Sequence, residues 1–159
     1  MRPITLVSSN LICVVIVLTL LGNEARLVAA QNATSAQARD RRMIRNLIRQ
    51  ENDGRRVIKY TNEPIFVSGA YPRPLTGAQA RSELRDDNRG KRTVRQEMIR
   101  LTISKSRDVA YDFGNFRMSY DDPEGKRVSL SGSYLRVWRK LVGKWKVDAL
   151  FARPNRESQ

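Results

Sequence analysis

The sequence has no histidine and only one cysteine, Cys13. Without histidine there can be no Ser-His-Asp triad, no histidine-ligated zinc or iron site and no imidazole proton shuttle. One cysteine cannot form a disulfide within the chain. Any chemistry must therefore depend on Asp, Glu, Tyr, Lys and Arg side chains.

Acidic residues are few, because 16 Asp and Glu stand against 30 Lys and Arg and leave a net charge of +14 on 159 residues. One interpretation is a surface that binds a polyanion, such as an acidic wall polymer, lipopolysaccharide, anionic lipid or extracellular nucleic acid. The other is a solvated basic surface that favours solubility. No nucleic-acid-binding motif accompanies the charge, so we expect no specific nucleic-acid binding and favour the second interpretation.

The N-terminus has the layout of a secretory signal peptide. Arg2 gives a positive start, Leu11 to Gly22 is uncharged, and small residues precede Gln31. The apolar run is shorter than the ~20 residues that span a bilayer, so we favour cleavage after Ala30 over a retained anchor. Removing residues 1–30 takes away two arginines, one glutamate and the cysteine, so 129 residues would keep a net charge of +13. We expect a periplasmic or secreted protein with no stable membrane anchor after cleavage.

The remaining sequence predicts one α+β domain over residues 39–153, after a disordered leader at 31–38 and before a tail at 154–159. Apolar spacing predicts helices at 39–53 and 79–89, a short helix or turn at 55–61, and a strand at 65–67. Four antiparallel strands are expected at 93–104, 109–120, 128–140 and 145–152.

Seven short stretches occur in an order that resembles one superfamily. They are Leu47 to Asn52, Tyr60 to Ser68, Pro74 to Gly77, Asp108 to Tyr111, Gly125-Lys126, Tyr134 to Lys140 and Gly143 to Val147. Together they resemble the nuclear transport factor 2-like superfamily, and within it the SnoaL-like branch, close to the group called domain of unknown function 4440.

The resemblance implies a cystatin-like α+β roll, in which a curved antiparallel sheet wraps around N-terminal helices and forms a cone with a pocket. It also implies a homodimer, because members often pair through the outer sheet face. The same cone hosts isomerases, cyclases, dehydratases and proteins without known activity, so the fold alone does not define the function.

Our leading hypothesis is that the cone binds a small apolar molecule with little or no catalysis. Where many SnoaL-like sequences carry His or Asp on the last strand, this chain has Ala149, Leu150 and Phe151. Alternation places Trp145, Val147, Ala149 and Phe151 on one inward face and Asp148 on the other. The expected pocket residues are Tyr60, Phe66, Tyr120, Tyr134, Trp145, Ala149 and Phe151.

The rival hypothesis is an isomerase or cyclase of the ketosteroid-isomerase type, or a lyase, that uses neither metal nor cofactor. Asp112 would be the base, and Tyr111, Tyr60 or Tyr120 would polarise a carbonyl. The aromatic neighbours Tyr111 and Phe113 could raise the pKa of Asp112. However, alternation with those neighbours favours an outward Asp112 that pairs with an arginine in solvent.

Two arginines could also hold a ligand carboxylate if they pointed inward, Arg117 and Arg136. We expect both to point outward, because a buried unpaired arginine is costly. The acidic turn at Asp121, Asp122 and Glu124 lacks the ligand spacing of a calcium loop. We therefore expect no metal and no cofactor.

Overall fold

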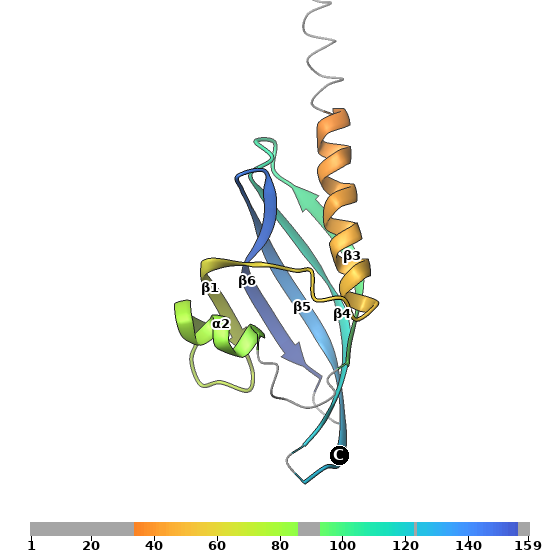
Figure 1. Ribbon diagram of the computed structural model, residues 1–159, viewed down its shortest axis with the longest axis vertical. Coiled ribbons are helices and arrows are strands. Elements are labelled where there is room, and N and C mark those ends of the chain that lie inside the picture. The colour runs from red at the N-terminus through yellow and green to blue at the C-terminus, as the bar shows by residue number, and fades with distance from the viewer. Residues whose placement is uncertain (1–33, 86–92, 123, 156–159) are drawn as a thin grey trace, which may run out of the picture. The chain divides into compact units, whose positions relative to one another are not determined.

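The computed structural model describes residues 34–85, 93–122 and 124–155 (Figure 1). The chain forms two compact units, Met1–Arg39 and Asp40–Gln159. In the first unit, residues 34–39 are helical, although residues 31–38 were predicted to be a disordered leader. Ala36 and Ala38 favour a helix without any apolar periodicity, which explains the error. The predicted signal peptide lies outside the described residues.

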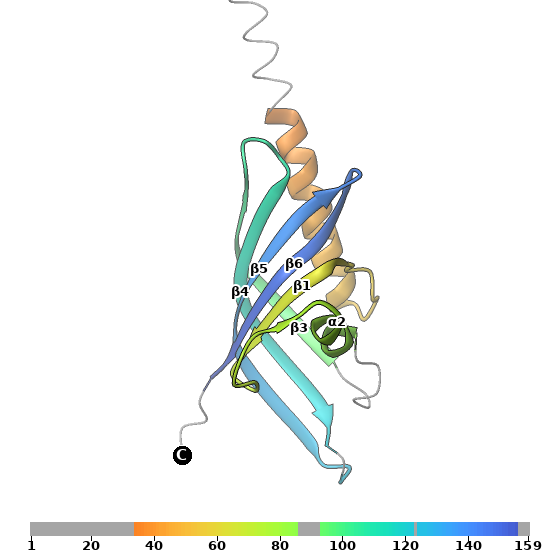
Figure 2. The ribbon, with the colours of Figure 1, turned by 90° about the vertical axis from the view of Figure 1, so that its left-hand side faces the viewer.

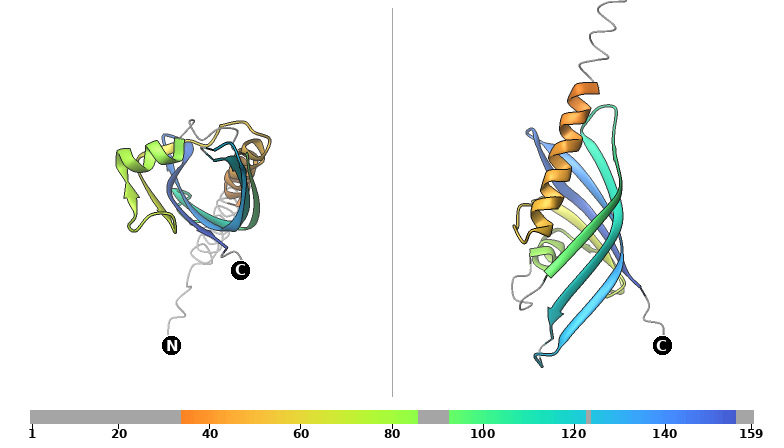
Figure 3. Two further views of the ribbon diagram at one scale, coloured as in Figure 1. Left: turned by 90° about the horizontal axis from the view of Figure 1, so that it is seen from below. Right: turned by 90° about the vertical axis from the view of Figure 1, so that its right-hand side faces the viewer.

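The second unit contains one six-stranded mixed sheet with the strand order β2-β1-β6-β5-β4-β3. Its elements are β1 Tyr60–Ser68, β2 Leu75–Thr76, α2 Gly77–Arg85, β3 Thr93–Ile103, β4 Val109–Asp121, β5 Arg127–Leu141 and β6 Lys144–Pro154. All neighbouring pairs are antiparallel except β1 and β6, which are parallel. The sheet is strongly curved (Figure 3), so the predicted α+β class with a curved sheet is correct.

The first helix, residues 34–52, ends where the sequence predicts. Gly54 has a φ of +81°, and the Arg55 amide donates to the Gln50 carbonyl at 2.9 Å, which forms a Schellman-type end. The short helix or turn expected at 55–61 does not form. Instead, the amides of Val57 and Ile58 donate to the Glu51 carboxylate and the chain continues into β1.

The core lies between this helix and one face of the sheet, which we call the inner face. Ile44 and Ile48 of the helix pack with Leu101, Ile103, Ala110, Trp138, Trp145 and Val147. The apolar spacing that predicts this helix includes Met43, Ile44 and Ile48, of which the two isoleucines are buried as that spacing implies, whereas Met43 is 43% exposed. The curved strands and the helix that they enclose are visible in Figure 2. No helix in the described part of the chain is long and apolar enough to cross a membrane.

Two β-bulges change which side chains reach the inner face. In β3 the register shifts between Met98 and Arg100, so Ile99 is 61% exposed instead of sharing a face with Leu101 and Ile103. In β6, Val147 pairs with Trp138 while Ala149 pairs with Val137, so Asp148 is the extra residue. An extra residue reverses the alternation beyond it.

Candidate functional site

A buried ion pair joins Asp112 of β4 to Arg136 of β5, which are cross-strand partners on the inner face. The Arg136 Nε donates to Asp112 Oδ1 at 3.1 Å, and Nη2 donates to Oδ2 at 2.9 Å. Asp112 is 0% exposed and Arg136 is 3% exposed. The expectation that both would point outward into solvent is therefore wrong. The expected arginine partner of Asp112 is present, but inside the protein.

Neighbouring side chains complete this cluster. The Trp138 Nε1 also donates to Asp112 Oδ1, and Arg136 Nη1 donates to the Gln96 side-chain oxygen at 2.8 Å. The guanidinium lies 4.9 Å from the ring centroids of both Tyr134 and Trp138. These two aromatics are two residues before and after Arg136 on β5, so strand alternation places all three on one face. Cation–π contacts partly replace the lost hydration of the arginine.

The surroundings of Arg136 keep its guanidinium charged beside the Asp112 carboxylate. Burial works against the charge on Arg136, but the hydrogen bonds and the negative charge of Asp112 outweigh it and raise the pKa of the guanidinium. Burial, together with the charge of Asp112, also raises the pKa of Tyr134, so this phenol stays protonated at neutral pH. The buried Tyr134 hydroxyl has no hydrogen-bond partner among the described residues. It is therefore a polar group that a ligand could bind.

A second buried carboxylate, Asp40 of the first helix, lies near the other end of β5. Its Oδ1 accepts from Lys140 Nζ at 2.6 Å and from Trp145 Nε1 at 3.3 Å, and its Oδ2 accepts from Arg107 Nε at 2.8 Å. Burial alone would raise the pKa of Asp40, but the three donors outweigh it and lower that pKa. This cluster fastens the helix to the sheet.

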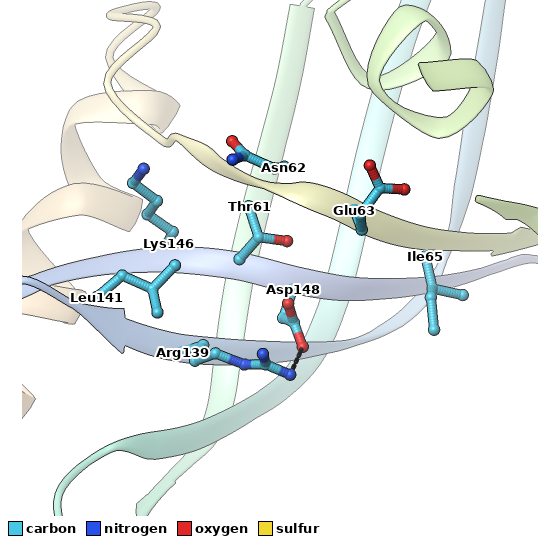
Figure 4. A pocket seen from close by; sticks show the side chains of 8 residues that line it. All are labelled: Thr61, Asn62, Glu63, Ile65, Arg139, Leu141, Lys146 and Asp148. Carbon is cyan, nitrogen blue, oxygen red and sulfur yellow. Dashed lines mark hydrogen bonds and ion pairs between the residues drawn. The ribbon is translucent and has the colours of Figure 1, made fainter. Parts of the chain in front are cut away.

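A cleft of about 400 Å³ opens on the opposite, outer face of the sheet. It is lined by Thr61, Asn62, Glu63, Ile65, Arg139, Leu141, Lys146 and Asp148 (Figure 4). None of the predicted pocket residues lines it.

The structure does not bring the predicted catalytic pair together. Tyr111 is 40% exposed and lies on the outer face, while Asp112 is buried on the inner one. Tyr60 packs half-buried against the core, and Tyr120 is half-buried near the end of β4. The expectation that Arg117 points outward is confirmed, because this residue is exposed.

The predicted pocket residues divide between the two faces. Tyr134 and Trp145 are buried on the inner face, and Phe66, half-buried, packs edge-on against Tyr71. Two assignments are wrong, because the bulge at Asp148 turns Ala149 and Phe151 toward the outer face, where Phe151 is 39% exposed. Leu150 takes the inner position instead and packs against the core.

Sequence reasoning did not assign a role to Gln96, Thr61 or Asp40. Nothing in their local patterns distinguishes them, because Gln96 and Asp40 bond to partners far away in the sequence, and the burial of Thr61 depends on the strands around it. The segment at Asp121, Asp122 and Glu124 closes a hairpin, in which the Lys126 amide donates to the Asp122 carboxylate. Within residues 34–85, 93–122 and 124–155, no three metal-binding side chains of the His, Cys, Asp or Glu type lie together.

No protein-family model matches the sequence, and no curated protein matches it. Several solved structures share its fold. A conserved protein from Planctomyces limnophilus is 16% identical with a TM-score of 0.57, over 76% of this chain and 97% of that one. A nuclear transport factor 2-like superfamily protein from Salmonella enterica is 12% identical with a TM-score of 0.56, over 78% and 96%.

The association domain of the C. elegans kinase CaMKII is also similar, with 18% identity and a TM-score of 0.50 over 74% of this chain and 95% of that one. Identities this low define a fold and leave function open. The chain has the nuclear transport factor 2-like fold.

Proposed function

We propose that this chain is an exported ligand-binding domain of the SnoaL-like kind that holds a small, largely apolar molecule against the inner face, with little or no catalysis. The observation that carries the proposal is the buried Tyr134 hydroxyl, which has no hydrogen-bond partner among the described residues. An unsatisfied buried hydroxyl costs about 1–3 kcal/mol, and an oxygen atom of a ligand would remove that cost.

The surroundings of Tyr134 favour a ligand that is mostly apolar. Along the inner face, Phe116 is 9% exposed, and Met98 and Leu150 are half-buried against the core. The polar groups near the hydroxyl are Arg136 and its partners. Of the five N–H groups of Arg136, three are used in the contacts with Asp112 and Gln96. A ligand with an apolar body and one oxygen-bearing group fits this pattern.

An isomerase or cyclase needs a base that can accept a proton from substrate. Both carboxylate oxygens of Asp112 already accept hydrogen bonds from Arg136, and Oδ1 accepts another from Trp138. Tyr111, the proposed polarising group, lies on the outer face. These contacts favour binding over catalysis. Deuterium exchange at the α-carbon of cyclic ketones, catalysed by the wild type and lost in Asp112→Asn, would instead support the enzyme.

Native mass spectrometry tests the binding proposal directly. The protein is purified from its own host, and its native mass is compared with its denatured mass. We expect an additional discrete mass in the native spectrum only. Tyr134→Phe removes the buried hydroxyl group and should reduce the bound fraction. Tyr111→Phe removes a hydroxyl group at an exposed position and should leave the bound fraction unchanged. Equal retention by both variants, or none by the wild type, would contradict the proposal.

Export is tested by the same intact mass. If cleavage follows Ala30, the protein recovered from the host begins at Gln31 and has lost Cys13. A mass that still includes residues 1–30 in the cytoplasmic fraction would refute export.

We further propose that a second copy of the chain covers part of the outer face of the sheet, namely an apolar band around Leu135 that does not include the residues lining the cleft. Leu135 pairs directly with Phe151 across β5 and β6 and with Phe113 across β4. Leu135, Phe151 and the nearby Tyr111 are 37–40% exposed, so they form an apolar band on this face. The likeness to an association domain supports self-association.

Light scattering after size exclusion tests the dimer. Leu135→Lys should convert a dimer into a monomer, because it places a charge in the middle of the apolar band. Val142→Lys is the control, since Val142 is fully exposed in the β5–β6 turn. A wild-type monomer, or a Leu135→Lys dimer, would disprove this arrangement.

A further inference from the structure

The cleft on the outer face is formed by two strand irregularities that face each other. In β1, the register with β6 shifts between Tyr60 and Ile65, so extra residues of β1 bow away from β6. In β6, Asp148 is the extra residue of the bulge, and its side chain lies on the outer face, where it accepts a hydrogen bond from Arg139 Nη2 at 2.7 Å. Bulges next to a site commonly re-aim a side chain. The cleft of about 400 Å³ lies between these irregular segments.

The wall of the cleft contains a buried polar atom that is not satisfied. Thr61 is 5% exposed, and its Oγ1 has no hydrogen-bond partner among the described residues. A side chain that cannot reach water and bonds to no protein group is costly unless something else bonds to it. Because Thr61 lines the cleft, a change of its χ1 rotamer would bring the hydroxyl to a ligand in the cleft, which would then supply that partner.

The charged groups of the cleft are arranged with opposite signs along its length. Figure 4 shows Lys146 beside Leu141 at one end, Glu63 beside Ile65 at the other, and Thr61 between them. Asp148 adds a second carboxylate, which already accepts a hydrogen bond from Arg139. Glu63 is 81% exposed and lies 3.7 Å from Arg81, so its carboxylate is only weakly neutralised, whereas Asp148 is paired closely with Arg139, which also lines the cleft. The cleft therefore has a positive end at Lys146, a negative end at Glu63, an ion pair and the Thr61 side chain between them, and an aliphatic side chain at each end.

We propose that this cleft binds a small zwitterion the size of a dipeptide, separately from the inner-face site. The ligand's carboxylate lies toward Lys146 and its ammonium toward Glu63 and Asp148. The Thr61 hydroxyl bonds to the polar group between them, and Leu141 and Ile65 contact apolar side chains of the ligand. The proposal does not depend on the inner-face ligand, because the two sites share no residue.

The test is a titration of the full chain, ¹⁵N-labelled, with L-leucyl-L-leucine, followed by amide chemical shifts. Two blocked probes separate the charges: N-acetyl-leucyl-leucine lacks the ammonium and leucyl-leucinamide lacks the carboxylate. We expect saturable shifts at Thr61, Lys146 and Asp148 with the free dipeptide, and binding at least about fivefold weaker with either blocked form. Shifts elsewhere, no saturation, or equal binding of a blocked form would overturn the proposal.

Three variants sharpen this result. Thr61→Val keeps the shape and removes the hydroxyl, so the dissociation constant should rise about fivefold. Lys146→Gln should weaken binding of the dipeptide and leave the binding of leucyl-leucinamide unchanged. Lys144→Gln removes the same charge two residues away, at an exposed position that does not line the cleft, and should have no effect. Equal losses in Lys144→Gln and Lys146→Gln would show a general charge effect and refute the site.

Discussion

The buried pair of Asp112 and Arg136 allows a quantitative test, because removing one partner should lower the free energy of unfolding strongly, whereas removing both should change it little. Arg136→Met removes the two hydrogen bonds that the guanidinium donates to the 0% exposed carboxylate of Asp112 and keeps the one from the Trp138 indole. Breaking a buried ion pair in this way costs about 3–5 kcal/mol. Since small domains have a total stability of about 5–15 kcal/mol, the loss is a large share of it. It corresponds to a fall in Tm of roughly 10–25 °C for a domain of this size.

The double variant Asp112→Leu/Arg136→Met should recover most of this loss. It leaves no buried charge, and its side chains still fill the space between Tyr134 and Trp138. Replacing a whole buried pair by apolar side chains of similar volume is commonly neutral or stabilising, so we expect a stability within about 1 kcal/mol of the wild type. Urea unfolding followed by far-ultraviolet circular dichroism measures the wild type, the single variants Asp112→Leu and Arg136→Met, and the double variant on one scale.

A surface pair serves as the control. Arg127 and Asp121 lie 2.9 Å apart, but their side chains are 45% and 38% exposed. Arg127→Gln should therefore change the stability by no more than about 0.5 kcal/mol. The reasoning fails if Arg136→Met costs no more than Arg127→Gln. It also fails if the double variant is as unstable as the two single variants added together.

Three further results are expected. The pKa of Asp40 is lowered in the folded protein, so its carboxylate stabilises the fold fully above the unfolded pKa of about 3.8. This stabilisation is lost as the pH falls through the folded pKa. Unfolding measured at a series of pH values should show the loss in the wild type and not in Asp40→Asn. Gly132→Ala would place a Cβ atom 2.3 Å from the Arg153 carbonyl oxygen, so it should destabilise by about 1–3 kcal/mol in urea unfolding, whereas Gly69→Ala, with nothing within 4 Å, should not. The net charge of +14 should hold the protein on heparin at low salt, and elution at moderate salt would indicate nonspecific charge, whereas retention at high salt would support a polyanion site.

The order and type of the elements could be predicted because they depend on local patterns. Alternation located β3 to β6 to within two residues, and Gly54 ended the first helix as expected. The parallel pairing of β1 with β6 could not be predicted, because it joins residues that are about 85 positions apart in the sequence. The bulges could not be predicted either, since they depend on the register with a neighbouring strand. A single extra residue at Asp148 exchanged the faces of Leu150 and Phe151.

The candidate site was missed for a different reason, which concerns β4. A sheet with one solvated face shows which residues point inward, because the other positions are polar. On β4 the two faces carry Ala110, Asp112 and Phe116, or Tyr111 and Phe113, so aromatic residues occur on both. Because the two neighbours of Asp112, Tyr111 and Phe113, are both aromatic, the sequence favoured an inward position for them and an outward one for Asp112, which is wrong. Tyr111, which contributed to this error, belongs to the apolar band with Leu135 and Phe151, and the half-buried Phe113 pairs with Leu135. If a second copy covers that band, β4 is buried on both faces in the assembly, and the ambiguity of its sequence is itself a consequence of self-association.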